Sequence, residues 1–178
     1  MLLLASPALL DPNFVDTVIL MLDVGPEGAL GVVLNRPTGL PVGEVLAPWS
    51  EVVAEPEVLF PGGPVETDGA LAVALRRSDG ADVLGLCEVV DRLALLDLDT
   101  PVELVSDELD GLRIFAGYAG WGAGQLEREI EEGSWYVVPG IARDVFRPDT
   151  STLRRDVLRR QPGDLAWHST RPVDADLN

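Results

Sequence analysis

Two kinds of residue in this chain could bind a ligand or act on one: polar and aromatic side chains, and glycines that leave the backbone bare. An arginine can hold a carboxylate or a phosphate through two parallel hydrogen bonds, and glycine lets a ligand approach the main chain closely. Tyrosine and tryptophan supply large contact surfaces. We therefore predict a binding surface drawn from three segments of the chain, with these members: Asn35, Arg36, Gly62, Gly63, Tyr118, Trp121, Gln125 and Glu129.

An alternative function is an enzyme that works through carboxylates. Glu129 and Asp11 are the candidates for its general acid and base. All 13 basic residues are arginine, which excludes a Schiff-base lysine and a P-loop lysine. The single histidine, His168, lies in the C-terminal tail, which disfavours a Ser-His-Asp system. Because no arrangement of nucleophile and base is evident, we predict no catalytic residue and favour a non-enzymatic binding or regulatory protein.

The same residues also allow a structural interpretation. Asn35 can cap a turn, and Arg36 can pair with one of the many acids in the chain. The glycines can serve simply as bends. Convergence of Arg36 with Tyr118, Trp121 and Gln125 on one cleft would favour the binding interpretation instead.

The richest of the three segments covers residues 117–130. Its pattern predicts the end of a strand over 112–119, a glycine turn, and a helix over 124–132 that stops at Gly133. A glycine-rich loop that opens a helix could present backbone N–H groups to an anion. The glycines alternate with other residues, which does not match the G-x-G-x-x-G spacing of dinucleotide sites. The glutamates that follow are typical of a solvated helix face.

The chain contains no recognisable motif for a metal or a cofactor. Carboxylates are abundant, but none falls in an EF-hand loop or an H-E-x-x-H pattern, and we predict no metal and no cofactor. Cys87 is the single cysteine, so neither an intramolecular disulfide nor a cysteine cluster can form. Its apolar neighbours predict a buried structural thiol.

The charge of the chain is strongly acidic. Its 178 residues carry 30 acids against 13 bases, a formal charge of −17. Such a field repels nucleic acids and anionic membrane surfaces, so we expect a protein partner or a small-molecule ligand instead. The bases gather late in the chain, where aspartates are interleaved; the cluster can be a docking face or a balanced solvated face, and it comprises Arg143, Arg147, Arg154, Arg155, Arg159 and Arg160.

The apolar pattern predicts many short strands and few helices. The N-terminus of the chain lacks the basic region of a signal peptide, and no apolar stretch is long enough to span a bilayer, so we expect a cytoplasmic protein. Asp149, Thr150 or Ser151 can cap the last helix. Residues 102–104 are a weaker strand or loop, and 78–80 are a turn. Strands are predicted over 2–5, 15–23, 29–35, 58–60, 70–75, 82–89, 112–119 and 135–138, and helices over 41–46, 124–132, 141–146 and 151–160.

These elements favour one domain over residues 1–160 and an irregular tail over 161–178. Strands outnumber helices and hairpins outnumber crossovers, which indicates an α+β fold with a mixed, largely antiparallel sheet.

Several motifs resemble one family. They are Leu3-Leu4-Ala5-Ser6-Pro7, Leu10-Asp11-Pro12-Asn13-Phe14, Gly28-Ala29-Leu30-Gly31-Val32-Val33-Leu34-Asn35-Arg36-Pro37, Gly62-Gly63-Pro64-Val65 and the segment 117–130. Together they are similar, in order, to the signatures of the bacterial YqgE/AlgH family, also called UPF0301 or DUF179. The resemblance implies a bifurcated, barrel-like sheet flanked by helices. It implies no established biochemical activity, although one branch of the family has been associated with transcriptional regulation.

Overall fold

One long strand, β8 (Leu109–Gly122), lies at the centre of the fold. The computed structural model describes residues 1–77 and 83–170. Within these ranges the other strands are β1 (Leu2–Ala5), β2 (Val18–Gly25), β3 (Gly28–Val33), β4 (Phe60–Pro61), β5 (Val65–Arg76), β6 (Leu86–Val90), β7 (Leu93–Leu96) and β9 (Trp135–Val138).

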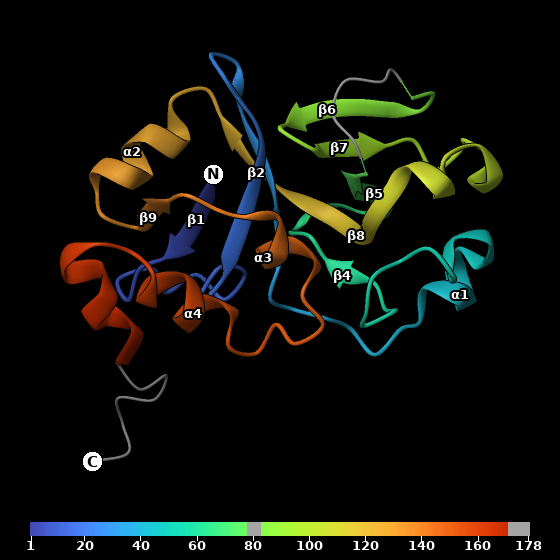
Figure 1. The fold of residues 1–178 in the computed structure, drawn as a ribbon. Coiled ribbons are helices and arrows are strands. Elements are labelled where there is room, and N and C mark those ends of the chain that lie inside the picture. The colour runs from blue at the N-terminus through green and yellow to red at the C-terminus, as the bar shows by residue number, and fades with distance from the viewer. Residues whose placement is uncertain (78–82, 171–178) are drawn as a thin grey trace.

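The strands form one sheet in the order β6-β7-β5-β8-β3-β2-β1-β9, and β4 pairs with β8 off this path (Figure 1). The sheet divides along β8, because residues 109–116 pair with β5 whereas Ala119 to Gly122 pair with β3. The pairing of β4 with β8 is parallel, and the pairings along the main path are antiparallel. The predicted α+β fold with a bifurcated, largely antiparallel sheet is therefore confirmed.

The predicted glycine turn after β8 is wrong for most of its length. Residues 120–122 continue the strand beyond its predicted end at Ala119, and Gly28 to Gly31 of β3 pair with Gly122 to Ala119. Only Ala123 and Gly124 form the turn before helix α2 (Gln125–Glu131). Strand pairing satisfies the backbone groups of the glycine segment, and this tertiary gain overrides the local tendency of glycine to form loops.

The helices are short and lie around the sheet. The weak strand or loop predicted at 102–104 is a turn of 3₁₀ helix, and strand β7 was not predicted. Thr152 is the N-cap residue of the last helix, in place of the residues predicted, because Asp149 instead accepts hydrogen bonds from the backbone N–H and hydroxyl of Ser151. Besides α2, the helices are α1 (Val42–Val45), α3 (Ala142–Phe146) and α4 (Leu153–Arg159), with 3₁₀ turns at Ala47–Trp49, Val102–Leu104, Ser106–Glu108 and Gly163–Thr170.

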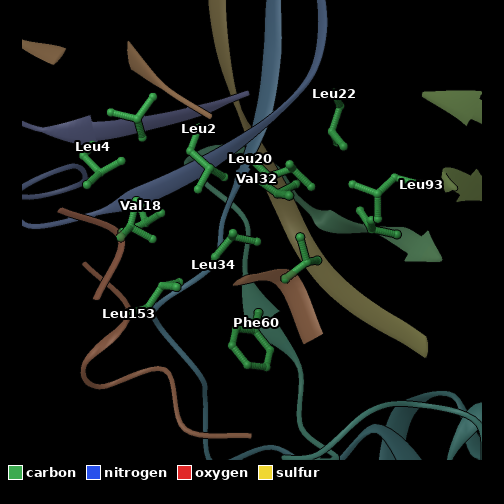
Figure 2. Close-up of a cluster of buried hydrophobic side chains, with 14 of the residues drawn as sticks. Leu2, Leu4, Val18, Leu20, Leu22, Val32, Leu34, Phe60, Leu93 and Leu153 are labelled. Carbon is green, nitrogen blue, oxygen red and sulfur yellow. The ribbon is translucent and has the colours of Figure 1, made fainter. Parts of the chain in front are cut away.

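The largest core cluster joins the first strands to the C-terminal helices. Figure 2 shows Leu2, Leu4, Val18, Leu20 and other members pointing toward one another between these elements. Its members come from β1, β2, β3, β4, β5, β7, β8, β9, α3 and α4, so the cluster ties both halves of the divided sheet together. Burial of this apolar surface is the main stabilising contribution to the fold.

Cys87 is exposed, so the prediction of a buried thiol is wrong. It lies on β6, the strand at one edge of the sheet. Successive side chains of a strand point to opposite faces, and here Leu86 lies partly in the core while Cys87 points to solvent. The apolar neighbours of Cys87 in the sequence therefore did not indicate a buried side chain.

The C-terminal segment is more regular than expected as far as it is described. Gly163–Thr170 form a 3₁₀ helix, and Leu165 packs against the main core cluster, which supplies the physical reason for the order. Residues 171–178 and the predicted turn at 78–80 lie outside the described residues. Within the described ranges, none of the helices has the length and apolar character that crossing a bilayer requires.

Candidate functional site

The motif segments 28–37 and 62–65 approach the second half of β8 through their glycines. A Cβ added at Gly28 would overlap the carbonyl oxygen of Trp121, and one added at Gly62 would overlap that of Gly117. One added at Gly63 would overlap the carbonyl group of Tyr118. These glycines are therefore required for close approach of three chain segments.

A groove follows from this packing. It consists of two hollows, of about 660 and 300 Å³, which are both lined by Tyr118. The two share Leu30 and Tyr118, so they form one surface, which we call the Tyr118 groove. Its lining residues are Leu30, Tyr118, Val65, Gly120, Trp121, Gly28 and Ala29, the hairpin residues Asp23, Gly25, Pro26 and Glu27, and, beyond the tyrosine, Glu66, Gly69, Ala70, Leu71 and Gly117.

A bulge in β5 forms one wall of the groove. The β5–β8 register jumps between Val65 and Ala70, so four residues arch out opposite Gly117. Glu66 in this arch has a φ of 49°, in the left-handed region that is uncommon for a side-chain-bearing residue. The wall opposite is the β2–β3 hairpin, which projects beyond the sheet in Figure 1.

Three carboxylates border the Tyr118 groove. Asp23, Glu27 and Glu66 are all exposed, and each lines one of the two hollows. Among the described residues none of them forms a salt bridge or accepts a side-chain hydrogen bond. No arginine lines the groove within the same ranges. The groove thus has an apolar floor and a negatively charged rim.

Glu129 is half-buried, and its carboxylate accepts hydrogen bonds from three side chains. Its Oε2 accepts hydrogen bonds from the indole N–H groups of Trp121, at 2.9 Å, and Trp135, at 2.8 Å. Its Oε1 accepts one from the amide of Gln125 at 2.9 Å. Gln125 in turn accepts the backbone N–H of Gly122 at 3.1 Å. The geometry makes Glu129 the acceptor that fixes α2 against β8 and β9.

An aromatic cluster surrounds this carboxylate. The rings of Trp121 and Trp135 meet edge to face at 5.9 Å, and Phe14 stacks on Trp121 at 6.2 Å. The two tryptophans are 6% and 3% exposed. Trp121 therefore reaches the Tyr118 groove only at its margin, and most of its ring lies in the core.

Asn35 and Arg36 hold the loop that precedes β2. The side chain of Asn35 accepts the N–H of Val18 and donates to the carbonyl of Asp16, both at 2.9 Å. The guanidinium of Arg36 donates to the carbonyls of Asn13 at 2.8 Å and Val15 at 2.9 Å. Arg36 thus binds backbone oxygens in place of the acid or the ligand considered from the sequence.

The predicted residues fall into separate groups in space. Trp121, Gln125 and Glu129 come together as one hydrogen-bonded unit, whereas Arg36 reaches the 12–15 loop. Tyr118 belongs to the main core cluster and faces the groove.

Sequence reasoning missed two features of this region. The first is Trp135, whose indole N–H donates to Glu129. It lies six residues after Glu129, and this short spacing could have suggested the contact. The acids of the groove rim sit in turns or bulges, where an exposed carboxylate carries no distinctive signal.

Other sequence candidates have defined surroundings. Asp11 accepts the N–H of Asn13 at 2.8 Å in the turn that precedes Phe14. His168 stacks on Tyr136, with ring centroids 5.3 Å apart. No group of three or more histidine, cysteine or acidic side chains placed to hold a metal occurs in the part of the chain that the structure describes.

Arg113 is a buried cation that the sequence reasoning did not single out. It is 1% exposed on β8, and its guanidinium lies over the ring of Phe60, 4.3 Å from the ring centroid. It donates to the backbone carbonyls of Glu55 at 2.6 Å and Arg147 at 3.2 Å, while no carboxylate pairs with it among the described residues. Burial lowers the pKa of Arg113 to about 10. The sequence signal that could have indicated this buried cation is an arginine inside an otherwise apolar strand.

The late arginine cluster is largely bound within the protein. Arg160 pairs with the buried Asp144, and Arg147 donates to Asp156 at 2.9 Å. Arg154 donates to the carbonyl of Ala5 at 2.8 Å. These contacts favour the interpretation of a balanced structural face.

Comparison with known proteins agrees with the motifs. The family model described as AlgH-like, DUF179, matches residues 2–166. This chain belongs to the AlgH-like family. A UPF0301 protein of Streptomyces coelicolor is 52% identical over 180 residues, covering 99% of this chain and 93% of that protein. A UPF0301 protein of Mycobacterium leprae is 44% identical over 179 residues, covering 99% and 89%. Their names give the family and state no activity.

Solved structures show the same fold. The crystal structure of a protein from Corynebacterium diphtheriae has a TM-score of 0.89 and 32% sequence identity, covering 96% of this chain and 90% of that one. The solution structure of the AlgH protein from Pseudomonas aeruginosa has a TM-score of 0.69 and 29% identity, covering 96% and 92%. The AlgH-like fold therefore extends over nearly the whole chain.

Proposed function

We propose that this AlgH-like protein is a non-enzymatic binding protein of the bacterial cytoplasm and that it binds its ligand or partner in the Tyr118 groove. One observation carries the proposal. The three motif segments 28–37, 62–65 and 117–130 all contribute to this groove, through Gly28 to Leu30, through Val65, and through Gly117 to Trp121. An apolar hollow of this size with polar groups at its edge is the usual form of a recognition site.

The state of the carboxylates supports binding over catalysis. Glu129, the first acid–base candidate, accepts three hydrogen bonds from neighbouring side chains. A general base needs a free lone pair directed at a substrate proton. Asp11 is likewise used in a turn. A regulatory role exerted through a bound partner is consistent with this arrangement.

Gly120 offers a clean way to block the groove. It lines the larger hollow, and a Cβ at this position would meet the ring of Tyr118 at 3.4 Å and Val65 at 3.7 Å, which are ordinary contacts. A leucine here should fill the floor of the groove without disturbing the fold. Gly39 is the matched control, since it is exposed and has nothing within 4 Å of its Cβ position.

The test is a thermal-shift screen of wild type, Gly120→Leu and Gly39→Leu against nucleotides, metabolites, simple anions and short peptides. A ligand at a hundred times its Kd should raise the Tm of wild type and Gly39→Leu by about 5–10 °C. Gly120→Leu should show no shift. Equal stabilisation of all three proteins would place the site elsewhere, and a screen that stabilises none of them would contradict the proposal.

A further inference from the structure

We propose that the occupant of the Tyr118 groove is a cationic, partly apolar peptide segment of a partner protein. This inference rests on the proposed function of the groove and adds the chemistry of its partner. It follows from the charge of the rim, the nature of the floor and the shape of the two hollows.

The rim carries charge that the protein itself does not neutralise. Some carboxylates elsewhere are paired, such as Asp110 with Arg92 and Asp144 with Arg160. Asp23, Glu27 and Glu66 have no such partner in the described ranges, and no arginine lines the groove there. Carboxylates held around an apolar hollow attract a cation and repel an anion, so they select the sign of the partner's charge.

The floor suits the stem of a long basic side chain. Leu30, Val65, Leu71 and Tyr118 provide apolar and aromatic surface, and Gly120 leaves the backbone open between them. Arginine and lysine lay their methylene groups along such a surface and keep the charged end at the rim. A guanidinium can also stack over the face of a tyrosine.

The shape of the groove suits an extended segment. Its two hollows adjoin each other at Leu30 and Tyr118, which line both. In an extended chain every second side chain points the same way, and such side chains are roughly 7 Å apart. Two basic residues at positions i and i+2 could therefore enter the two hollows together. A membrane or nucleic acid surface would instead bring anionic phosphates against the acidic rim.

The experiment uses a fluorescein-labelled heptapeptide in which arginine alternates with valine and leucine, and the full-length protein. Binding is measured by fluorescence anisotropy and mapped by backbone amide chemical shifts. Two control peptides carry glutamine or glutamate in place of each arginine. We expect saturable binding of the arginine peptide, with the largest shifts at Leu30, Tyr118 and Gly120.

Two variants that each remove three negative charges separate the groove from the general field of the protein. The groove variant is Asp23→Asn/Glu27→Gln/Glu66→Gln. The control variant, Glu103→Gln/Asp107→Asn/Glu108→Gln, changes exposed acids of the 3₁₀ turns outside the groove. The groove variant should weaken binding on the order of tenfold, as expected for three exposed ion pairs, and the control variant less than twofold.

Each outcome decides between the two proposals. Equal weakening by both variants would mean non-specific attraction to an acidic protein and would overturn the inference. Equal binding of the glutamine or glutamate peptide in the groove would overturn the cationic partner while leaving the groove as a binding site. If no peptide shifts the groove resonances, and the screen with Gly120→Leu also fails, the proposed function itself falls.

Discussion

The substitution Glu129→Ala tests whether this carboxylate is a structural acceptor. It removes the partner of three N–H groups, two of which belong to tryptophans that are 6% and 3% exposed. Each hydrogen bond to a charged group contributes about 1.5–3 kcal/mol, and a buried donor left without a partner costs a similar amount. Glu129 itself is only half-buried, so water can replace part of the loss. We therefore expect a decrease of about 3 kcal/mol in the free energy of unfolding.

The assay is urea unfolding followed by tryptophan fluorescence and circular dichroism, together with a thermal melt. For a chain of 178 residues a loss of 3 kcal/mol should lower the Tm by about 6–12 °C. Glu131→Ala is the matched control, because it removes an exposed glutamate from the same helix. Glu129→Gln should lie between the two, since its carbonyl oxygen can still accept the indoles while its amide faces the donor of Gln125.

Two results would refute this reasoning. A free energy of unfolding for Glu129→Ala within about 0.5 kcal/mol of that for Glu131→Ala would show that the hydrogen bonds contribute little. A stable Glu129→Gln protein that has lost a measured turnover would return Glu129 to the role of acid or base.

Three further predictions concern single residues. Gly63→Ala should lower the free energy of unfolding by more than about 2 kcal/mol, because its Cβ would overlap the carbonyl group of Tyr118. Gly120→Ala should change the same quantity by less than about 0.5 kcal/mol, and urea titration measures it for both variants. Cys87 should react with a thiol reagent in the folded protein at the rate of an exposed thiol, and reaction only after unfolding would contradict its exposure. Hydrogen bonds from Thr152 and then Arg147 lower the pKa of Asp156, so the carboxylate stabilises the fold above about pH 4, and this stabilisation is lost as the pH falls through the lower pKa of the folded state. Asp156→Asn should therefore lower the Tm at pH 7, by an amount that corresponds to less than about 1 kcal/mol in the free energy of unfolding. The Tm difference between the two proteins should vanish in acid.

Prediction from the sequence succeeded where the signal was local. The apolar runs at 2–5 and 135–138 are strands β1 and β9 with the predicted bounds, and the helix after Gly124 stops before Gly133. These elements depend on residues close together in the chain, namely apolar side chains, caps and breakers. The motifs also identified the family, because they recur in order along the chain.

Prediction failed where distant segments decide the outcome. Gly120 and Gly122 were expected in a turn but lie in a strand, because β3, from far along the chain, pairs with residues 119–122. Cys87 was expected in the core but faces solvent, because β6 is an edge strand. Neither cause can be read from the residues on either side.

The sequence by itself determined the family, the antiparallel strand content, the excess of negative charge and the set of residues around which the site was sought. The tertiary structure decided what those residues do. It turned Arg36 toward backbone carbonyls, bound Glu129 between two indoles and left Tyr118 facing an acidic groove. The physical reason is that a polar side chain takes its role from the donors, acceptors and charges that the fold brings to it, and most of these come from far along the chain.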